Sequence, residues 1–183
     1  RGGTVIDPAI GFQGIKDVLV QGGEIVAIDP AAETIAAQVV DATGCYVFPG
    51  LIDYHTHLFQ GGTHIGTAPD SSLLPQGVTT AVDQGSAGVA NFERFFDTIV
   101  ARSQVRIYSH LHVVPVGLES LPKQPETIEP GRFDLERTRT LFAKYAGQLL
   151  GLKIRQSREI VGEMGLTPLR ETIRLAEAIG CPV

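Results

Sequence analysis

The chain has 183 residues, 43% of them hydrophobic, and a formal net charge of −5. This is enough apolar material for one substantial core. With no long basic run, no Trp and few aromatic residues, the composition argues against nucleic acid as a partner. No stretch reaches the roughly 18 apolar residues of a membrane span, and no signal peptide is recognisable, so we expect no membrane partner.

The two cysteines and the two ends of the chain give further expectations. Cys45 and Cys181 lie far apart and form no CxxC pair, so we interpret them as reduced core thiols, which predicts a cytoplasmic protein. The chain opens at Arg1 without Met and stops at Val183, where a new apolar segment begins. We therefore expect that both ends are cut from a longer polypeptide.

The first segment, residues 1–46, has a β-rich pattern. Gly22 and Gly23 separate two apolar runs as a hairpin turn does. Residues 31–37 have no strand signal and are expected to form a connector. The apolar runs interpreted as strands are 4–6, 17–20, 24–28 and 38–40.

From residue 47 onward, strand-like apolar runs alternate with amphipathic helical ones. The expected strands are 47–57, 79–84, 105–114 and 149–155, and the expected helices are 90–102, 134–147 and 167–179. This rhythm indicates a parallel α/β sheet, and both an open doubly wound sheet and a (β/α)8 barrel fit it. Because such a barrel usually needs about 250 residues, four strands and one just starting make half of it. The proline-marked stretch 121–131 would then be a loop near the catalytic mouth.

Two histidines and one lysine are the candidate metal ligands. His55 and His57 close an apolar strand, and residues two apart in a strand share one face. Asp53 would lie deeper on that face, either holding an imidazole or as a capped core carboxylate. Lys153 lies in the apolar run 149–155, where burial is costly unless its amine is used. The alternative is a lysine whose amine reaches the rim.

The segment Phe48-Pro-Gly-Leu-Ile-Asp-Tyr-His-Thr-His57, followed by Gly77-Val-Thr-Thr-Ala-Val-Asp83, resembles the opening signature of the amidohydrolase superfamily. The resemblance implies metal-dependent hydrolases on a distorted (β/α)8 barrel that carries a small β-sandwich. Residues 1–46 would be the N-terminal share of the sandwich, and residues 47–183 the first half of the barrel. The C-terminal half of the barrel would be missing.

The resemblance also implies the cofactors. Lys153 would react with carbon dioxide to form a carbamate that bridges two divalent ions, with His55 and His57 as further ligands. Zinc suits imidazole and oxygen ligands. Two ions can polarise a carbonyl and supply a metal-bound hydroxide at neutral pH.

The remaining groups of the family's site are expected elsewhere. The aspartate that acts as base and two more histidine ligands would lie beyond Val183, so the 183-residue chain alone is expected to be inactive. His110 and His112 have no metal role in the family pattern and are interpreted as core or mouth histidines. His64, in a glycine-rich loop, is a candidate substrate contact.

The segments 60–66, 82–92 and 151–157 are similar to a subgroup described as dihydroorotase-like or amidohydrolase/deacetylase. This implies release of an acyl group from a small N-acyl or O-acyl carboxylate. The alternatives are opening of a cyclic amide, as in dihydroorotase or hydantoinase, and a non-catalytic fragment. Arg155 would pair with a substrate carboxylate or form a strand-end ion pair. Residues 85–88 would offer amides to a substrate anion or form a plain turn. A homo-oligomer is expected to be possible.

Overall fold

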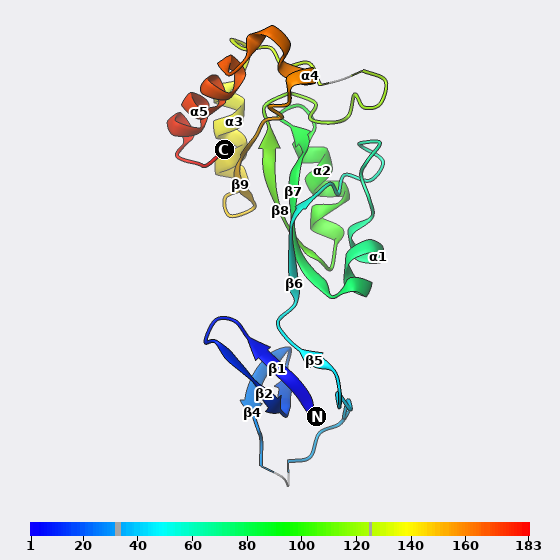
Figure 1. Ribbon diagram of the computed structural model, residues 1–183. Helices are drawn as coiled ribbons and strands as arrows, with labels where there is room; N and C mark the ends of the chain where they lie inside the picture. The colour runs from blue at the N-terminus through cyan, green and yellow to red at the C-terminus, as the bar shows by residue number, and fades with distance from the viewer. Residues whose placement is uncertain (32–33, 125) are drawn as a thin grey trace. The chain divides into compact units, whose positions relative to one another are not determined.

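The computed structural model describes residues 1–31, 34–124 and 126–183 and divides the chain into two compact units, Arg1–Gly50 and Leu51–Val183 (Figure 1). From the sequence, the boundary between the β-rich segment and the barrel segment was predicted between residues 46 and 47. The expected connector 31–37 lies partly outside the described residues, as does the expected loop 121–131. Each unit is described by itself below.

The first unit is built from short strands. β1 pairs antiparallel with β2 and parallel with β5, while β3 and β4 form a hairpin. The hairpin turn is Gly22–Gly23, with φ angles of 62° and 85°, which suits the turn type that two-residue hairpins prefer. This confirms the predicted hairpin. The strands are β1 (Gly3–Asp7), β2 (Phe12–Lys16), β3 (Val18–Gln21), β4 (Glu24–Ile28) and β5 (Tyr46–Val47).

The predicted strand at residues 38–40 is wrong, because this segment has no strand conformation. Val39 and Val40 are 58% and 66% exposed, so among the described residues little packs against this apolar run. The Val40 carbonyl instead accepts a hydrogen bond from the N-terminal amine at 2.7 Å. Strand β2 was not predicted, because a glycine and two polar residues interrupt its apolar pattern.

The second unit contains a four-stranded sheet in the sequential order β6-β7-β8-β9, with every neighbouring pair parallel. The strands lie side by side in Figure 1. Beyond helix α5, the Pro182 carbonyl accepts a hydrogen bond from the Leu152 amide at 2.9 Å, so the chain returns beside β9. The bounds are β6 (Leu51–Thr56), β7 (Val78–Gly88), β8 (Arg106–His112) and β9 (Leu149–Lys153).

Helices follow the strands in the alternating order that a (β/α)8 barrel requires. The Asp134 side chain caps α3 by accepting from the Arg137 amide at 2.9 Å. Gly180 ends α5 with a φ of 83°. Three helices were predicted, and the two short ones, α1 and α4, were not. The bounds are α1 (Pro69–Leu73), α2 (Phe92–Thr98), α3 (Leu135–Lys144), α4 (Arg158–Val161) and α5 (Thr167–Ile179).

The core of the second unit lies between the sheet and its helices. Phe95 of α2 is 0% exposed and packs against Phe59 and Phe92, with ring centroids 5.0 Å and 6.0 Å away. Leu111 of β8 and Leu152 of β9 belong to the same buried cluster. This one-sided packing of successive β/α units confirms the predicted half of a (β/α)8 barrel.

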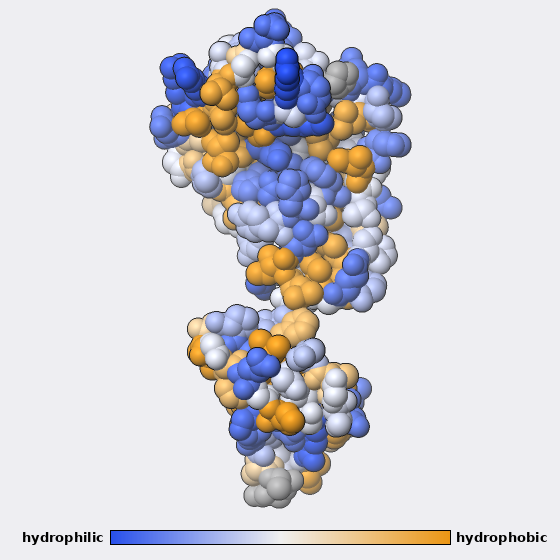
Figure 2. All heavy atoms as spheres, viewed as in Figure 1, coloured by the Kyte–Doolittle hydropathy of each residue, from blue (hydrophilic) through white to orange (hydrophobic). Residues whose placement is uncertain are grey.

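Hydrophobic side chains also reach the surface of both units, visible as orange spheres in Figure 2. Ile25 in the first unit is 67% exposed, and Ile52 and Tyr54 on the edge strand β6 are 66% and 60% exposed. Within the described residues, no helix has the length and apolar character that crossing a membrane requires.

The core packing predicts that Phe95→Ala lowers the free energy of unfolding by about 3–5 kcal/mol, because it leaves a cavity between α2 and Phe59. Urea denaturation would measure the loss. Asp97→Ala on the exposed face of α2 is the control and should change stability by less than about 0.5 kcal/mol. Equal losses in the two variants would contradict the packing described.

Candidate metal site

The predicted ligands all lie where the parallel strands of the second unit end. His55 lies near the end of β6 and His57 just beyond it, with ring centroids 5.8 Å apart and ring planes at 83°. Lys153 ends β9 and is the register partner of His112 on β8. The carboxyl ends of parallel strands are where barrel enzymes place their chemistry.

Gly85 makes room for Lys153. A Cβ atom at this glycine would lie 2.7 Å from Cγ of Lys153 and 3.1 Å from Cδ2 of His112, which is too close for any other residue. The φ of Gly85 is also +76°, a value that favours glycine. The lysine stem therefore lies directly on the backbone of β7, beside the ring of His112.

A buried carboxylate holds the end of β6 against β7. Asp83 is 0% exposed. Its Oδ2 accepts from the Leu58 amide and from the Ser86 hydroxyl, both at 2.7 Å, and its Oδ1 accepts from the Ser86 amide at 2.7 Å. A buried carboxylate is costly unless donors satisfy it, and here Leu58, just beyond β6, and Ser86 of β7 do so.

The same network orients His57. Because the Ser86 hydroxyl donates to Asp83, its oxygen is left to accept, and it lies 3.2 Å from Nδ1 of His57. Nδ1 then carries the proton, and Nε2 has the free lone pair that a metal needs. Outer partners of this kind fix the orientation of histidine ligands.

The electrostatics keep that lone pair available. Burial, followed by the charges of His55 and Lys153, lowers the pKa of His57 to about 4. His57 is therefore neutral at pH 7. Burial also raises the pKa of Asp83 to about 6, despite its hydrogen bonds. Burial, followed by the charges of Lys153 and His55, lowers the pKa of His110 as well.

Two imidazoles and an amine fit part of a metal site. Across residues 1–31, 34–124 and 126–183, no three His, Cys, Asp or Glu side chains cluster closely enough to hold an ion. The predicted set of His55, His57 and Lys153 contains one lysine, which would supply oxygen ligands only as a carbamate. His57, with a neutral ring and an oriented Nε2, has the chemistry that zinc prefers.

The other predicted residues have more ordinary contacts. Asp53 Oδ1 accepts from the backbone amide of His55 at 3.0 Å, so it holds the main chain and not the ring. Nδ1 of His110 donates to Gln84 Oε1 at 2.9 Å, since the Gln84 amide nitrogen donates to the Tyr54 carbonyl. His64 is exposed in its loop.

Hydrogen bonds bear on the alternatives for the amides of residues 85–88 and for Arg155. The amides of Ser86 and Gly88 donate to the side chains of Asp83 and Asn91, so they are not free to bind a substrate anion. Arg155 Nη2 donates to Glu159 at 3.0 Å, which is the strand-end ion pair that was one of its two expected roles. His112 is fully buried, as a core histidine is.

Three residues of the site were missed in the sequence. Asp83 and the Ser86 side chain had no predicted role, although the backbone amides of residues 85–88 did, and Glu126 lies in the loop after the third barrel strand. An acidic residue inside an otherwise apolar strand was a signal for Asp83, because a buried carboxylate needs donors.

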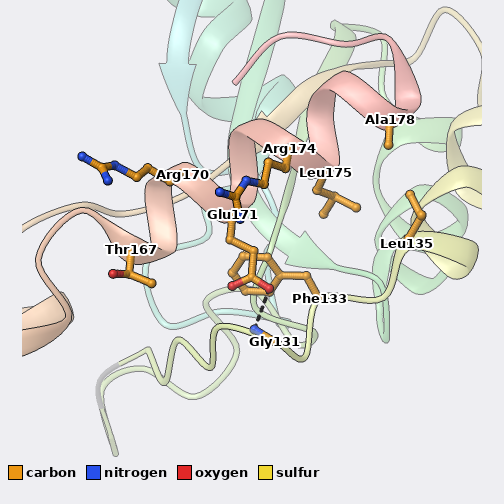
Figure 3. Close-up of a pocket in the computed structure, with 9 residues that line it drawn as sticks. All are labelled: Gly131, Phe133, Leu135, Thr167, Arg170, Glu171, Arg174, Leu175 and Ala178. Carbon is orange, nitrogen blue, oxygen red and sulfur yellow. Dashed lines mark hydrogen bonds between the residues drawn. The ribbon is translucent and has the colours of Figure 1, made fainter.

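A hollow of about 690 Å³ lies away from these residues, between α5 and the segment before α3 (Figure 3). Phe133 and Leu175 form its apolar wall, and the Glu171 carboxylate accepts from the Gly131 amide at 2.6 Å. Arg170 points away from the hollow in the close-up. None of the predicted ligands lines it.

Comparisons with known proteins show which chains this one is similar to. Residues 38–93 match the model of the amidohydrolase family. The chain is 36% identical over 173 residues to a deacetylase of Agrobacterium fabrum and 35% identical over 169 residues to a deacetylase of Brucella anthropi. These matches cover 93% and 91% of this chain. The crystal structure of a dihydroorotase superposes with a TM-score of 0.84 at 33% identity, over 98% of this chain.

The chain belongs to the amidohydrolase superfamily. This confirms the predicted resemblance. The chain spans 42% of the length of each deacetylase and 48% of the dihydroorotase chain. The activity of the whole protein is therefore a matter for proposal.

The hydrogen bonds of Asp83 predict that Asp83→Asn lowers the free energy of unfolding at pH 7.5 by about 1–3 kcal/mol, because the amide group turns a donor toward a buried N–H or O–H. Thermal and chemical unfolding would measure the loss. Asp97→Asn, on an exposed position, is the matched control. A stable Asp83→Asn variant would show that Asp83 does not hold the two strands together.

Proposed function

We propose that the complete polypeptide containing this chain is a metal-dependent deacetylase that cleaves an amide or ester bond of a small N-acyl or O-acyl carboxylate. The observation that supports it best is that His55, His57 and Lys153 all lie at the carboxyl ends of the barrel strands. Two relatives carry the name deacetylase, which favours an acyl group as the part released.

In this proposal each residue has a defined task. His55 and His57 hold two divalent ions, for which zinc is the best chemical fit, through neutral ring nitrogens. The unprotonated amine of Lys153 attacks carbon dioxide, a C–N bond forms and a proton leaves, so that the resulting anionic carbamate adds oxygen ligands. When bound, the ions polarise the substrate carbonyl and lower the pKa of water toward neutrality.

The 183 residues do not supply every group that such a reaction needs. We propose that the aspartate acting as base and two further histidine ligands lie in the remainder of the protein, since the chain spans 42% of its deacetylase relatives. The 183-residue chain alone is then expected to show no turnover. Turnover by the isolated chain would contradict this part of the proposal.

A second candidate function is the opening of a cyclic amide. It is supported by the similarity to the dihydroorotase structure. Both reactions need the same polarised carbonyl, so the site residues alone do not separate them. A panel that compares N-acetyl and O-acetyl carboxylates with dihydroorotate and hydantoins would separate them by the relative kcat/KM.

The proposal predicts that the complete protein holds about two zinc ions per chain and that Lys153→Ala loses at least one of them. Its kcat/KM on the preferred substrate should fall by more than about 100-fold, the upper range for removing outer partners of a metal ligand. Metal analysis and steady-state kinetics would measure both effects. Lys123→Ala, in an exposed loop, is the control. A wild-type protein without metal under replete conditions would contradict the proposal.

The contact between Ser86 and His57 predicts weaker zinc binding in Ser86→Ala. Without the hydroxyl, Nδ1 of His57 has no fixed partner, and zinc affinity should fall about 10-fold to 100-fold. Competition with a chromophoric chelator would measure the affinity. Ser71→Ala, on an exposed position of α1, should leave it unchanged. Equal affinities in both variants would mean that Ser86 does not orient the ring.

A further inference from the structure

A fully buried acidic residue lies beside the candidate site, and the proposed reaction does not use it. The side chains of Glu126 and His112 are each 1% exposed. Oε2 of Glu126 and Nε2 of His112 have no hydrogen-bond partner among the described residues. Buried polar atoms without partners are rare, so a buried carboxylate in such a place calls for a reason.

The contacts of Glu126 join three segments of the chain. Its Oε1 lies 3.6 Å from Nε2 of His112, at the end of β8, and its Oε2 lies 3.6 Å from Nη1 of Arg155, just after β9. Glu126 itself comes from the loop between β8 and α3. Both distances exceed those of normal hydrogen bonds. The contact with Arg155 is an ion pair near the upper limit of distance.

The proton positions favour this arrangement. Nδ1 of His112 accepts from the Val114 amide at 3.0 Å, so in the neutral ring the proton is on Nε2 and faces the carboxylate. Arg155 adds a permanent positive charge on the other side. The same loop also has an apolar anchor, because Ile128 is 5% exposed and belongs to the core cluster.

The cluster formed by Glu126, His112 and Arg155 lies beside the candidate ligand Lys153. His112 and Lys153 are register partners, and both contact the position of Gly85. We infer that Glu126 is a positioning residue: with His112 and Arg155 it fastens the β8–α3 loop across the ends of β8 and β9 and thereby fixes the place of Lys153. The part concerning Lys153 as a metal ligand rests on the proposed function.

This inference assigns Arg155 to the fold instead of the substrate. Its guanidinium lies between Glu126 and Glu159, two carboxylates of this chain. A substrate carboxylate would have to compete with both. The residue that recognises a substrate carboxylate is then a different one.

The loop offers a direct test in the complete protein, because trypsin cleaves after Lys123 and Arg132, on either side of Glu126. Glu126→Ala should speed cleavage at these bonds by about an order of magnitude or more, since the tie to β8 and β9 is lost. Mass spectrometry identifies the sites. Glu129→Ala is the matched control, because Glu129 pairs with Arg132 in the same loop and is exposed.

Glu126→Gln and Arg155→Gln test the pair if Glu126→Ala fails to fold. Each change alone leaves a buried charge or an amide facing a guanidinium, and each should speed cleavage. The double variant joins two amides and should be cleaved more slowly than the product of the single effects predicts. Additive effects, or Arg155→Gln behaving as wild type, would overturn the inference.

Zinc affinity separates positioning from simple loop stability. Glu126→Ala should bind zinc about 10-fold more weakly, as loss of an outer partner does. Ile128→Val loosens the apolar anchor of the same loop and should keep the affinity within about twofold. Unchanged affinity in Glu126→Ala would overturn the positioning role. If no variant or wild type binds zinc but the loop responds as predicted, the tie stands and the proposed function fails.

Discussion

The candidate site depends on the burial of one carboxylate, that of Asp83. It is 0% exposed and accepts three hydrogen bonds of 2.7 Å, from the chain that leaves β6 and from the end of β7. Such a group is tolerated inside a protein only where donors satisfy it. Because these donors come from neighbouring strands, the carboxylate fixes the end of β6, and with it His57, relative to β7.

The core and the candidate site occupy different parts of the second unit. The core lies between the sheet and its helices and includes Phe95 of α2 and Leu152 of β9. The carboxyl ends of the strands carry the histidines, Lys153 and the polar network that orients them. A barrel separates stability from chemistry in this way, which explains why the site can be built from short-range hydrogen bonds while the core supplies most of the stability.

The sequence predicted the elements that depend on a periodic pattern. The alternation of strands and helices, the shared face of His55 and His57, and the end of α5 at Gly180 all follow from local rules. The hydrogen-bond partners of Asp83 and Glu126 did not follow, because they join residues that are distant in the sequence. Strand β7 runs to Gly88, four residues beyond the predicted end at residue 84, and the side chains of Asp83 and Asn91 accept hydrogen bonds from its backbone there. Residues 38–40 show the opposite error, because this apolar run pairs with no strand in the part of the chain that the structure describes.

We propose that Lys153, modified by carbon dioxide, binds the same metal ions as His55 and His57. Carbon-13 NMR of the complete protein, loaded with zinc in labelled bicarbonate, would detect the modified lysine. We expect a carbamate resonance that is present in the wild type and absent in Lys153→Ala. A spectrum without that resonance, or a resonance that persists in Lys153→Ala, would contradict it.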